Sequence, residues 1–164
     1  MSKVEMVRQM YGYNRWANER LLDTAAAVDE AELKAPQSEG YLPILATFAH
    51  ILLAQNGWLA LWKTGRPSDR SFGEAFQSLE GVREALKECH LDLSNFVDGL
   101  TDERLGETLS LTDQSGESFE RQLWPMMVHV FNHGTYHRSE IALRLSDLGH
   151  SPGDLDYVDW MYPD

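Results

Sequence analysis

Cysteine is almost absent from the sequence: Cys89 is the only one in 164 residues, so no disulfide can form within the chain. The sequence also lacks the uninterrupted apolar segment of a secretory signal near its start. No apolar run approaches the ~20 residues that are needed to cross a bilayer. These absences predict a protein of a reducing compartment, the cytoplasm, that is not inserted in a membrane.

Basic residues are also few. Lysine and arginine number 14 against 26 aspartates and glutamates, which gives a formal net charge of -12. A broad nucleic-acid interface needs a basic face that displaces counterions from phosphates, and peripheral binding to anionic lipids needs one as well. We therefore expect neither a nucleic acid nor a membrane among the partners.

Several motifs of catalytic chemistry are missing too. The sequence has no glycine-rich phosphate loop, no Gly-x-Ser-x-Gly elbow and no His-Glu-x-x-His segment. Cys89 and His90 are adjacent, but neighbours on a helix project ~100° apart, which is a poor arrangement for a thiolate and its base. We interpret Cys89 as a packing residue, and the sequence identifies no catalytic residue.

Helical periodicity is the main pattern that the sequence does contain. Apolar residues recur at three- and four-residue steps through four segments. Capping boxes at Ser2 with Glu5 and at Ser71 with Glu74 mark two helix starts, and Gly149 marks a helix end. We expect the helices at residues 2–28, 43–64, 71–100 and 125–148.

A different pattern separates the last two of these helices. In residues 106–122 polar and apolar residues alternate around a turn-forming stretch, Asp113 to Gly116, which predicts a small β-hairpin. The acidic tail, residues 154–164, carries aromatics that we expect to pack on the body of the molecule or on a partner chain. A mass of 18.7 kDa suits a single domain. We predict one all-α domain over residues 1–164, a four-helix bundle with a small β-hairpin before its last helix.

Three histidines, His129, His133 and His137, lie in one helical segment at four-residue spacing. Each is raised by ~6 Å and rotated by ~40° from the one before, so two neighbours can share a metal ion. The outer pair is ~12 Å apart along the axis, too far to share one comfortably. The spacing leaves both neighbouring pairs open, His129 with His133 or His133 with His137, and the spare histidine would pack or contact a ligand.

His50 is the best candidate for a third ligand from another helix. It lies in an otherwise apolar stretch, residues 47–53, and burying a histidine without partners costs roughly 1–3 kcal/mol. Metal ligation removes that cost, but so does a hydrogen bond to a backbone carbonyl or a tyrosine. Spacing alone therefore supports a three-histidine site and ordinary packing about equally.

Three blocks of the sequence resemble the DinB/YfiT-like superfamily of metal-binding four-helix-bundle proteins. They are residues 13–22, residues 44–52 followed by Trp58-Leu59, and residues 129–138, which contain Asn-His-x-x-x-His-Arg. The likeness follows the whole chain in order, and the last block is its most specific part. Where the family often continues Arg-Gly-Gln, this chain has Arg138-Ser139-Glu140, so contacts that relatives make through the last two positions are not carried over.

The resemblance implies a DinB-like bundle, often dimeric, with one metal ion held by His50, His133 and His137. It makes His129 a residue that contacts a ligand rather than the ion. We therefore expect one divalent transition metal ion, zinc, nickel or iron, and a homodimer. Three neutral imidazoles leave an open coordination position, which is typical of catalytic rather than structural sites.

The superfamily includes transferases and isomerases that use low-molecular-weight thiols, and such chemistry suits an open three-histidine site. The resemblance thus favours a metal-dependent S-transferase or isomerase that combines a small thiol with an electrophilic small molecule. The alternatives are a non-enzymatic metal-binding protein associated with stress and a metal-dependent hydrolase.

Overall fold

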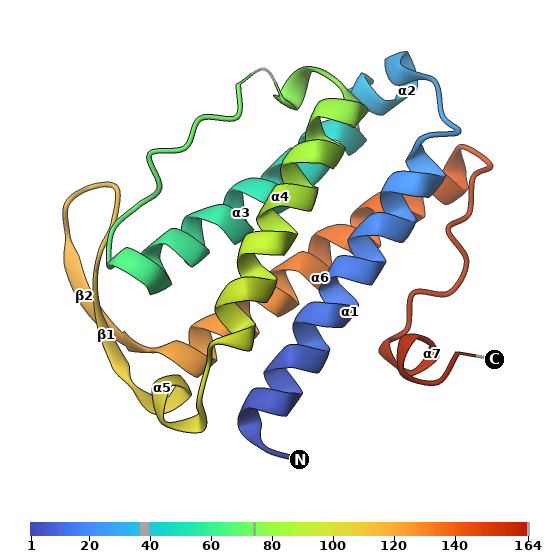
Figure 1. Cartoon of the computed structure of the whole chain (residues 1–164). Helices are drawn as coiled ribbons and strands as arrows, with labels where there is room; N and C mark the ends of the chain where they lie inside the picture. The colour runs from blue at the N-terminus through green and yellow to red at the C-terminus, as the bar shows by residue number, and fades with distance from the viewer. Residues whose placement is uncertain (37–39, 74, 164) are drawn as a thin grey trace.

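In the computed structural model, which describes residues 1–36, 40–73 and 75–163, the chain folds around four long helices (Figure 1). They are α1 (Lys3–Ala25), α3 (Ile44–Thr64), α4 (Leu79–Asp98) and α6 (Leu123–Asp147). Because α1 and α3 each contact both α4 and α6, the helices form a closed bundle in the order α1, α4, α3, α6. The expected all-α bundle with a small antiparallel sheet is confirmed.

Shorter elements connect the long helices. They are α2 (Glu30–Lys34), the 3₁₀ turn η1 (Ala75–Gln77), α5 (Asp102–Gly106), β1 (Thr108–Thr112), β2 (Ser118–Gln122) and α7 (Tyr157–Met161). The sequence did not predict α5 or α7. Each is a five-residue helix, too short to produce a periodic apolar pattern.

α1 begins where the sequence predicts. The N–H of Glu5 donates to the Ser2 hydroxyl oxygen at 3.1 Å, and the N–H of Ser2 donates to a Glu5 carboxylate oxygen at 2.6 Å. The capping box is therefore confirmed, and it satisfies two backbone donors that lack a partner within the helix. The helix ends at Ala25, before the expected residue 28.

α4 begins later than predicted. Its N-cap is Ser78, not Ser71, and the hydroxyl oxygen of Ser78 accepts the N–H of Gly81 at 3.1 Å. Glu74, half of the predicted capping box, lies outside the described residues. A Cβ on Gly81 would lie 2.6 Å from the carbonyl oxygen of Ala75, so the preceding chain folds tightly over the first turn of the helix. The cap at Ser78 and the close approach of Ala75 to Gly81 thus mark this start, and the signature at residue 71 does not.

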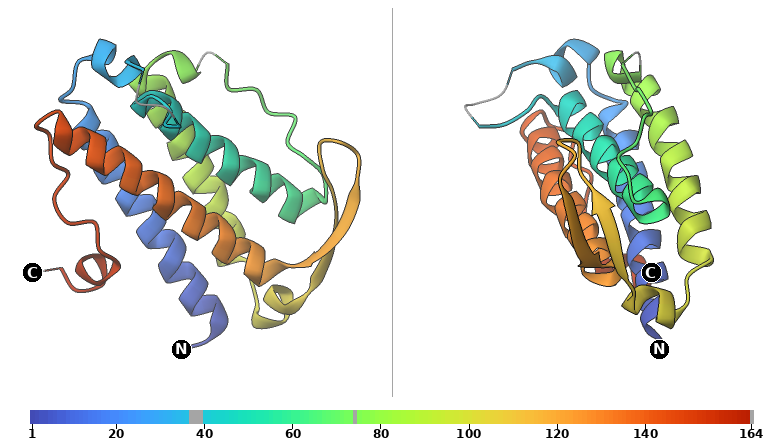
Figure 2. Two further views of the ribbon diagram at one scale, coloured as in Figure 1. Left: turned by 180° about the vertical axis from the view of Figure 1, so that it is seen from behind. Right: turned by 90° about the vertical axis from the view of Figure 1, so that its left-hand side faces the viewer.

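The predicted hairpin is confirmed between α5 and α6. β1 and β2 pair antiparallel, with Leu109 opposite Arg121. The N–H of Thr112 donates to the carbonyl oxygen of Gly65 at 2.9 Å, so the hairpin is attached to the C-terminal end of α3 (Figure 2). This attachment places the hairpin across the end of the α3–α6 pair.

α6 starts directly after β2, slightly before the predicted Pro125. This proline falls in the first helical turn, where its missing N–H removes no intrahelical bond. At the other end, Gly149 has φ 85°, its N–H donates to the Ser146 carbonyl oxygen, and the N–H of His150 donates to that of Leu145 at 2.8 Å. These paired bonds confirm Gly149 as the residue that closes the helix.

The C-terminal tail packs on α1 (Figure 1). The Tyr13 hydroxyl donates to the carbonyl oxygen of Leu155 at 2.6 Å. The Trp160 ring lies 3.0 Å from where a Cβ on Gly12 would stand, so this glycine makes room for the indole. Of the two expected positions for the tail aromatics, Trp160 takes the one on the body of its own chain.

The apolar character of α3 departs from one expectation. This 21-residue helix is long and apolar enough, by length and composition alone, to cross a membrane, so the prediction that no run approaches that length is wrong. Core helices pass the same test, and half of its most apolar stretch is buried in the structure. α3 packs against α4 and α6 and carries the half-buried His50 in this apolar setting.

Candidate metal centre

His50, His133 and His137 meet between α3 and α6, which run antiparallel side by side (Figures 1 and 2). One ligand nitrogen of each ring lies within 4.8 Å of the other two. The His137 ring centroid is 4.5 Å from that of His50 and 4.5 Å from that of His133. Nitrogens that share an ion at ~2.0–2.1 Å lie within about 4 Å of one another, so small ring rotations would close the set.

Buried neighbours fix the direction in which these rings project. On α3, Phe48 and Ile51 face the core, and His50 stands half-buried at the edge of that apolar face. On α6, Val130 and Ile141 face the core, and His133 and His137 stand half-buried at the edge of that face. The amphipathic pattern of each helix therefore turns its histidines toward the neighbouring helix.

His133 is the least satisfied member of the cluster. Its Nε2 atom is buried and has no hydrogen-bond partner among the described residues. Burial, together with the charges of His137 and His50, lowers the pKa of His133 to about 4. Burial also lowers the pKa of His50, followed by the charge of His137. Both rings are therefore neutral at pH 7 and can offer a lone pair, the form in which imidazole binds metal.

Glu140 holds the third ring. The Nδ1–H of His137 donates to a Glu140 carboxylate oxygen at 2.7 Å, which leaves the Nε2 atom of His137 as the nitrogen free to bind a metal. The two side chains are only 14 % and 21 % exposed, so solvent competes weakly for the bond. Sequence reasoning assigned Glu140 no role at this site. Its three-residue spacing after His137 was the available signal.

His129 lies outside the cluster but touches it. Its ring stacks on that of His133 with centroids 6.0 Å apart, and it meets the Trp58 ring edge-on at 5.6 Å. Within the described part of the chain no hydrogen bond joins His129 to the clustered histidines. Of the two neighbouring pairs that spacing left open, the fold brings His133 with His137, rather than His129, to His50.

Arg138, which directly follows His137, has a structural role that reasoning from spacing missed. Its side chain is buried and donates to the Asn14 side-chain oxygen at 2.5 Å and to the Thr135 hydroxyl oxygen at 2.8 Å. A Cβ on Gly134 would lie 2.8 Å from its guanidinium and 3.0 Å from the Asn14 oxygen. Gly134 therefore leaves the space through which Arg138 ties α6 to α1.

Cys89 and His90 do not form a reactive pair. Burial raises the pKa of Cys89 to about 12, which keeps the thiol protonated. His90 is also buried and accepts the side-chain N–H of Asn18 at Nε2, 3.0 Å away. Both are packing residues of the bundle, as the sequence indicated for Cys89.

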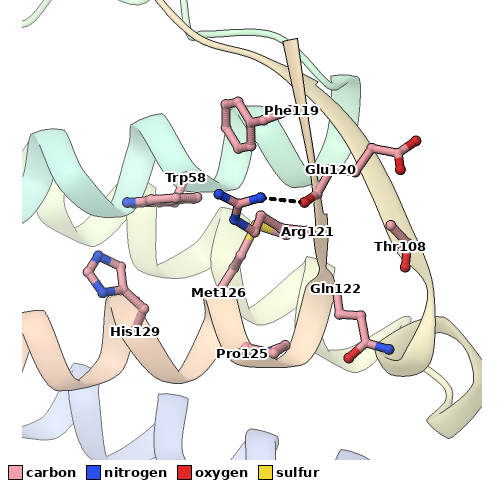
Figure 3. A pocket seen from close by; sticks show the side chains of 9 residues that line it. All are labelled: Trp58, Thr108, Phe119, Glu120, Arg121, Gln122, Pro125, Met126 and His129. Atoms are coloured by element: carbon pink, nitrogen blue, oxygen red, sulfur yellow. Dashed lines mark hydrogen bonds between the residues drawn. The ribbon is translucent and has the colours of Figure 1, made fainter.

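A pocket of 780 Å³ lies between His129 and the hairpin (Figure 3). None of the three clustered histidines lines it, and it reaches the cluster only through the His129 ring, which stacks on that of His133. Trp58 from α3 and His129 from α6 stand at its inner end, and the hairpin forms its outer wall. Its lining combines aromatic and polar side chains: Trp58, Thr108, Phe119, Glu120, Arg121, Gln122, Pro125, Met126 and His129. Volumes of about 300–1,000 Å³ are usual for small-molecule sites.

Comparison with known proteins gives a consistent result. A curated relative, Protein DinB of Bacillus subtilis (strain 168), is 25% identical over 156 residues, which cover 91% of this chain and 90% of the relative. The crystal structure of a DinB-like protein from Bacillus subtilis superposes with a TM-score of 0.64 at 12% identity, covering 87% of this chain and 94% of that one. The model of the DinB family matches residues 1–164. The chain belongs to the DinB family.

Proposed function

We propose that His50, His133 and His137 together hold one divalent transition metal ion. The buried Nε2 atom of His133 carries this proposal, because buried polar atoms are almost always paired and this one has no partner among the described residues. The Glu140 contact to His137 is the kind that orients metal-ligating histidines. Imidazole donors suit zinc, nickel and iron alike.

We propose further that the protein is a thiol-dependent S-transferase or isomerase. An ion with three protein ligands supplies an open position at which a thiol or water becomes more acidic. In such a transfer the thiol sulfur bonds to an electrophilic carbon, and the leaving group departs with the electron pair of its broken bond. The thiol proton passes to solvent or to the leaving group.

The pocket at His129, whose ring stacks on that of His133, favours an enzyme over a non-enzymatic metal-binding protein, because a bound ion alone needs no lined space of 780 Å³ near it.

The metal site is tested by elemental analysis of purified variants. His50→Ala, His133→Ala and His137→Ala should each lose bound metal, because each removes one of three ligands. His150→Ala is the matched control, since this histidine follows α6 and lies outside the cluster. Full metal occupancy in His50→Ala would overturn the site between the two helices.

The activity is tested by turnover. Metal-free protein and forms loaded with zinc, nickel or iron are assayed with glutathione or cysteine and an activated aryl halide. We expect thiol consumption only in a loaded form, and its loss in His133→Ala. Metal binding without turnover in every loaded form would leave the non-enzymatic alternative.

A further inference from the structure

The inner face of the hairpin carries one charged residue. Side chains alternate between the two faces of a strand, so Phe119 and Arg121 share a face and Glu120 takes the other. In the register, Leu109 stands opposite Arg121 and Leu111 opposite Phe119. Figure 3 shows the same arrangement: Arg121 extends toward Trp58 and Met126, while the carboxylate of Glu120 is turned away.

Arg121 has no acidic partner in the part of the chain that the structure describes. Its one hydrogen bond runs from Nη1 to the backbone carbonyl oxygen of Glu120 at 2.7 Å, and its guanidinium lies 5.5 Å from the centre of the Phe119 ring. Other guanidinium N–H donors therefore remain for a ligand, in a planar arrangement that matches a carboxylate. Arg121 is exposed to solvent at the wall of the pocket, and on a chain of net charge -12 an unpaired cation at this position is a local exception to the overall field.

Aromatic rings line the rest of the path from Arg121 to the histidine cluster. Trp58 and Phe119 offer flat apolar surfaces, and His129 closes the inner end, where its ring stacks on that of His133. A molecule with its anionic end on Arg121 would lay an apolar body along Trp58. Its far end would then point toward the ligand cluster.

We infer that this pocket binds an organic carboxylate with a flat apolar body, and that Arg121 receives the carboxylate. The inference rests on the proposed function, which supplies a reason for a substrate to lie beside the three histidines. It goes further by naming the class of electrophilic substrate and the residue that recognises it. A residue that only covered Phe119 with its aliphatic stem would make no distinction between charged and neutral ligands.

The test measures binding of 2-naphthoate and of its uncharged counterpart 2-naphthamide to metal-free protein, so that the carboxylate has no ion to bind. Isothermal titration gives the affinity, and the indole N–H signal of Trp58, assigned with Trp58→Phe, reports the location. Arg121→Gln removes the cation, and Arg121→Lys keeps the charge without the fork. Arg66→Gln is the matched control, an exposed arginine outside the pocket that also has no acidic partner among the described residues.

We expect naphthoate to shift the Trp58 signal and Arg121→Gln to weaken its binding about ten- to hundredfold. Arg121→Lys should retain part of the affinity, Arg66→Gln all of it, and naphthamide should bind weakly to every form. Equal affinity in Arg121→Gln, equal binding of the amide, or an unmoved Trp58 signal would overturn the inference. Melting temperatures check that each variant is folded.

The same series separates this inference from the proposed function. Carboxylate binding that depends on Arg121, without turnover in any metal-loaded form, would remove the enzymatic proposal and leave the binding site. Turnover that is indifferent to Arg121, together with naphthoate binding that is indifferent to it, would remove the binding site and leave the metal chemistry. His50→Ala should lose metal yet bind naphthoate as the wild type does.

Discussion

Glu140 decides how firmly the His137 ring is presented to a metal ion, because its carboxylate holds Nδ1. Glu140→Ala should therefore lower metal affinity by about 10–100-fold, as is typical when a partner of a ligating histidine is removed. Glu140→Gln keeps a hydrogen-bond acceptor without the charge, so its metal affinity should lie between those of the wild type and Glu140→Ala. Competition with a chelator of known affinity measures all three proteins. Glu117→Ala, an exposed acid of the hairpin, should change nothing; an unchanged Glu140→Ala would show that His137 needs no such support.

Gly134 is required by packing rather than by backbone conformation, since only its Cβ position conflicts with Arg138 and Asn14. Gly134→Ala should destabilise the fold by roughly 1–3 kcal/mol through overpacking, despite the better helix propensity of alanine. Gly57→Ala is the matched control, because it is also helical and a Cβ there meets nothing within 4 Å. It should stabilise the protein by roughly 0.5–1 kcal/mol. Urea denaturation distinguishes the two signs, and two stabilising substitutions would contradict the packing argument.

His90 makes stability depend on pH. Burial, then the charges of Arg15 and Arg138, lowers its pKa to about 4 from the ordinary 6.5. On acidification, His90 therefore becomes protonated near pH 6.5 in the unfolded chain but only near pH 4 in the folded chain. The contribution of neutral His90 to the free energy of unfolding is fully present above pH 6.5. It is lost as the pH drops toward 4, by up to roughly 3 kcal/mol.

This dependence is measured by urea denaturation of metal-free protein from neutral pH to about pH 4.5. His90→Gln has no such proton to take up, and its amide can still accept the Asn18 N–H. Its free energy of unfolding should fall less steeply with acid than that of the wild type. Parallel slopes would show that other groups cause the acid sensitivity.

At the scale of elements, the start of α4 makes a clear test. Ser78 caps α4 by accepting the Gly81 N–H, whereas Ser71 lies before η1 and does not cap α4. Ser78→Ala should cost roughly 0.5–2 kcal/mol of stability, the usual loss for an N-cap. Ser71→Ala should be close to neutral. The opposite result in thermal denaturation would place the helix start where the sequence predicted it.

The long helices were predictable because their signals are local. Ser2 with Glu5 and the glycine at 149 lie next to the residues that they cap, and each gave a correct end. The start of α4 was not predictable, because residues 71–74 carry the same signature while the true cap depends on a chain reversal against Gly81. A capping signature alone therefore does not decide between two neighbouring serines.

The candidate site was also predictable only in part from the sequence. The four-residue spacing in α6 restricted the metal to one of two pairs, and the apolar surroundings of His50 suggested the third ring. Which pair faces His50 depends on how far α3 lies along α6, a register between helices that are distant in sequence. Only the family resemblance gave that answer in advance. Arg121 had no signal, because its role depends on where the hairpin lies.

At the scale of the whole molecule, the exposed apolar surface of α6 is the feature that bears on self-association. Two of the large aromatic side chains pack within the chain: Trp62 is 1% exposed, and Trp160 packs on α1. Exposed apolar side chains remain along α6, and they are Trp124, Val128, Tyr136 and Leu143. This surface borders the candidate metal centre. A second copy of the chain bound there would therefore shield both the apolar surface and the metal centre from solvent.

We expect the protein to form a homodimer through this side of α6. Light scattering over the micromolar range should give about twice the monomer mass of 18.7 kDa. Leu143→Glu places a charge where a side chain is 62% exposed, and it should yield monomers, because a charge is costly to bury in an interface core. Leu91→Glu is the matched control, since Leu91 is 61% exposed on α4, and it should leave the dimer intact. A wild-type mass of one chain at every concentration would reject a stable dimer, yet it would leave the three-histidine proposal standing, because all three rings belong to one chain.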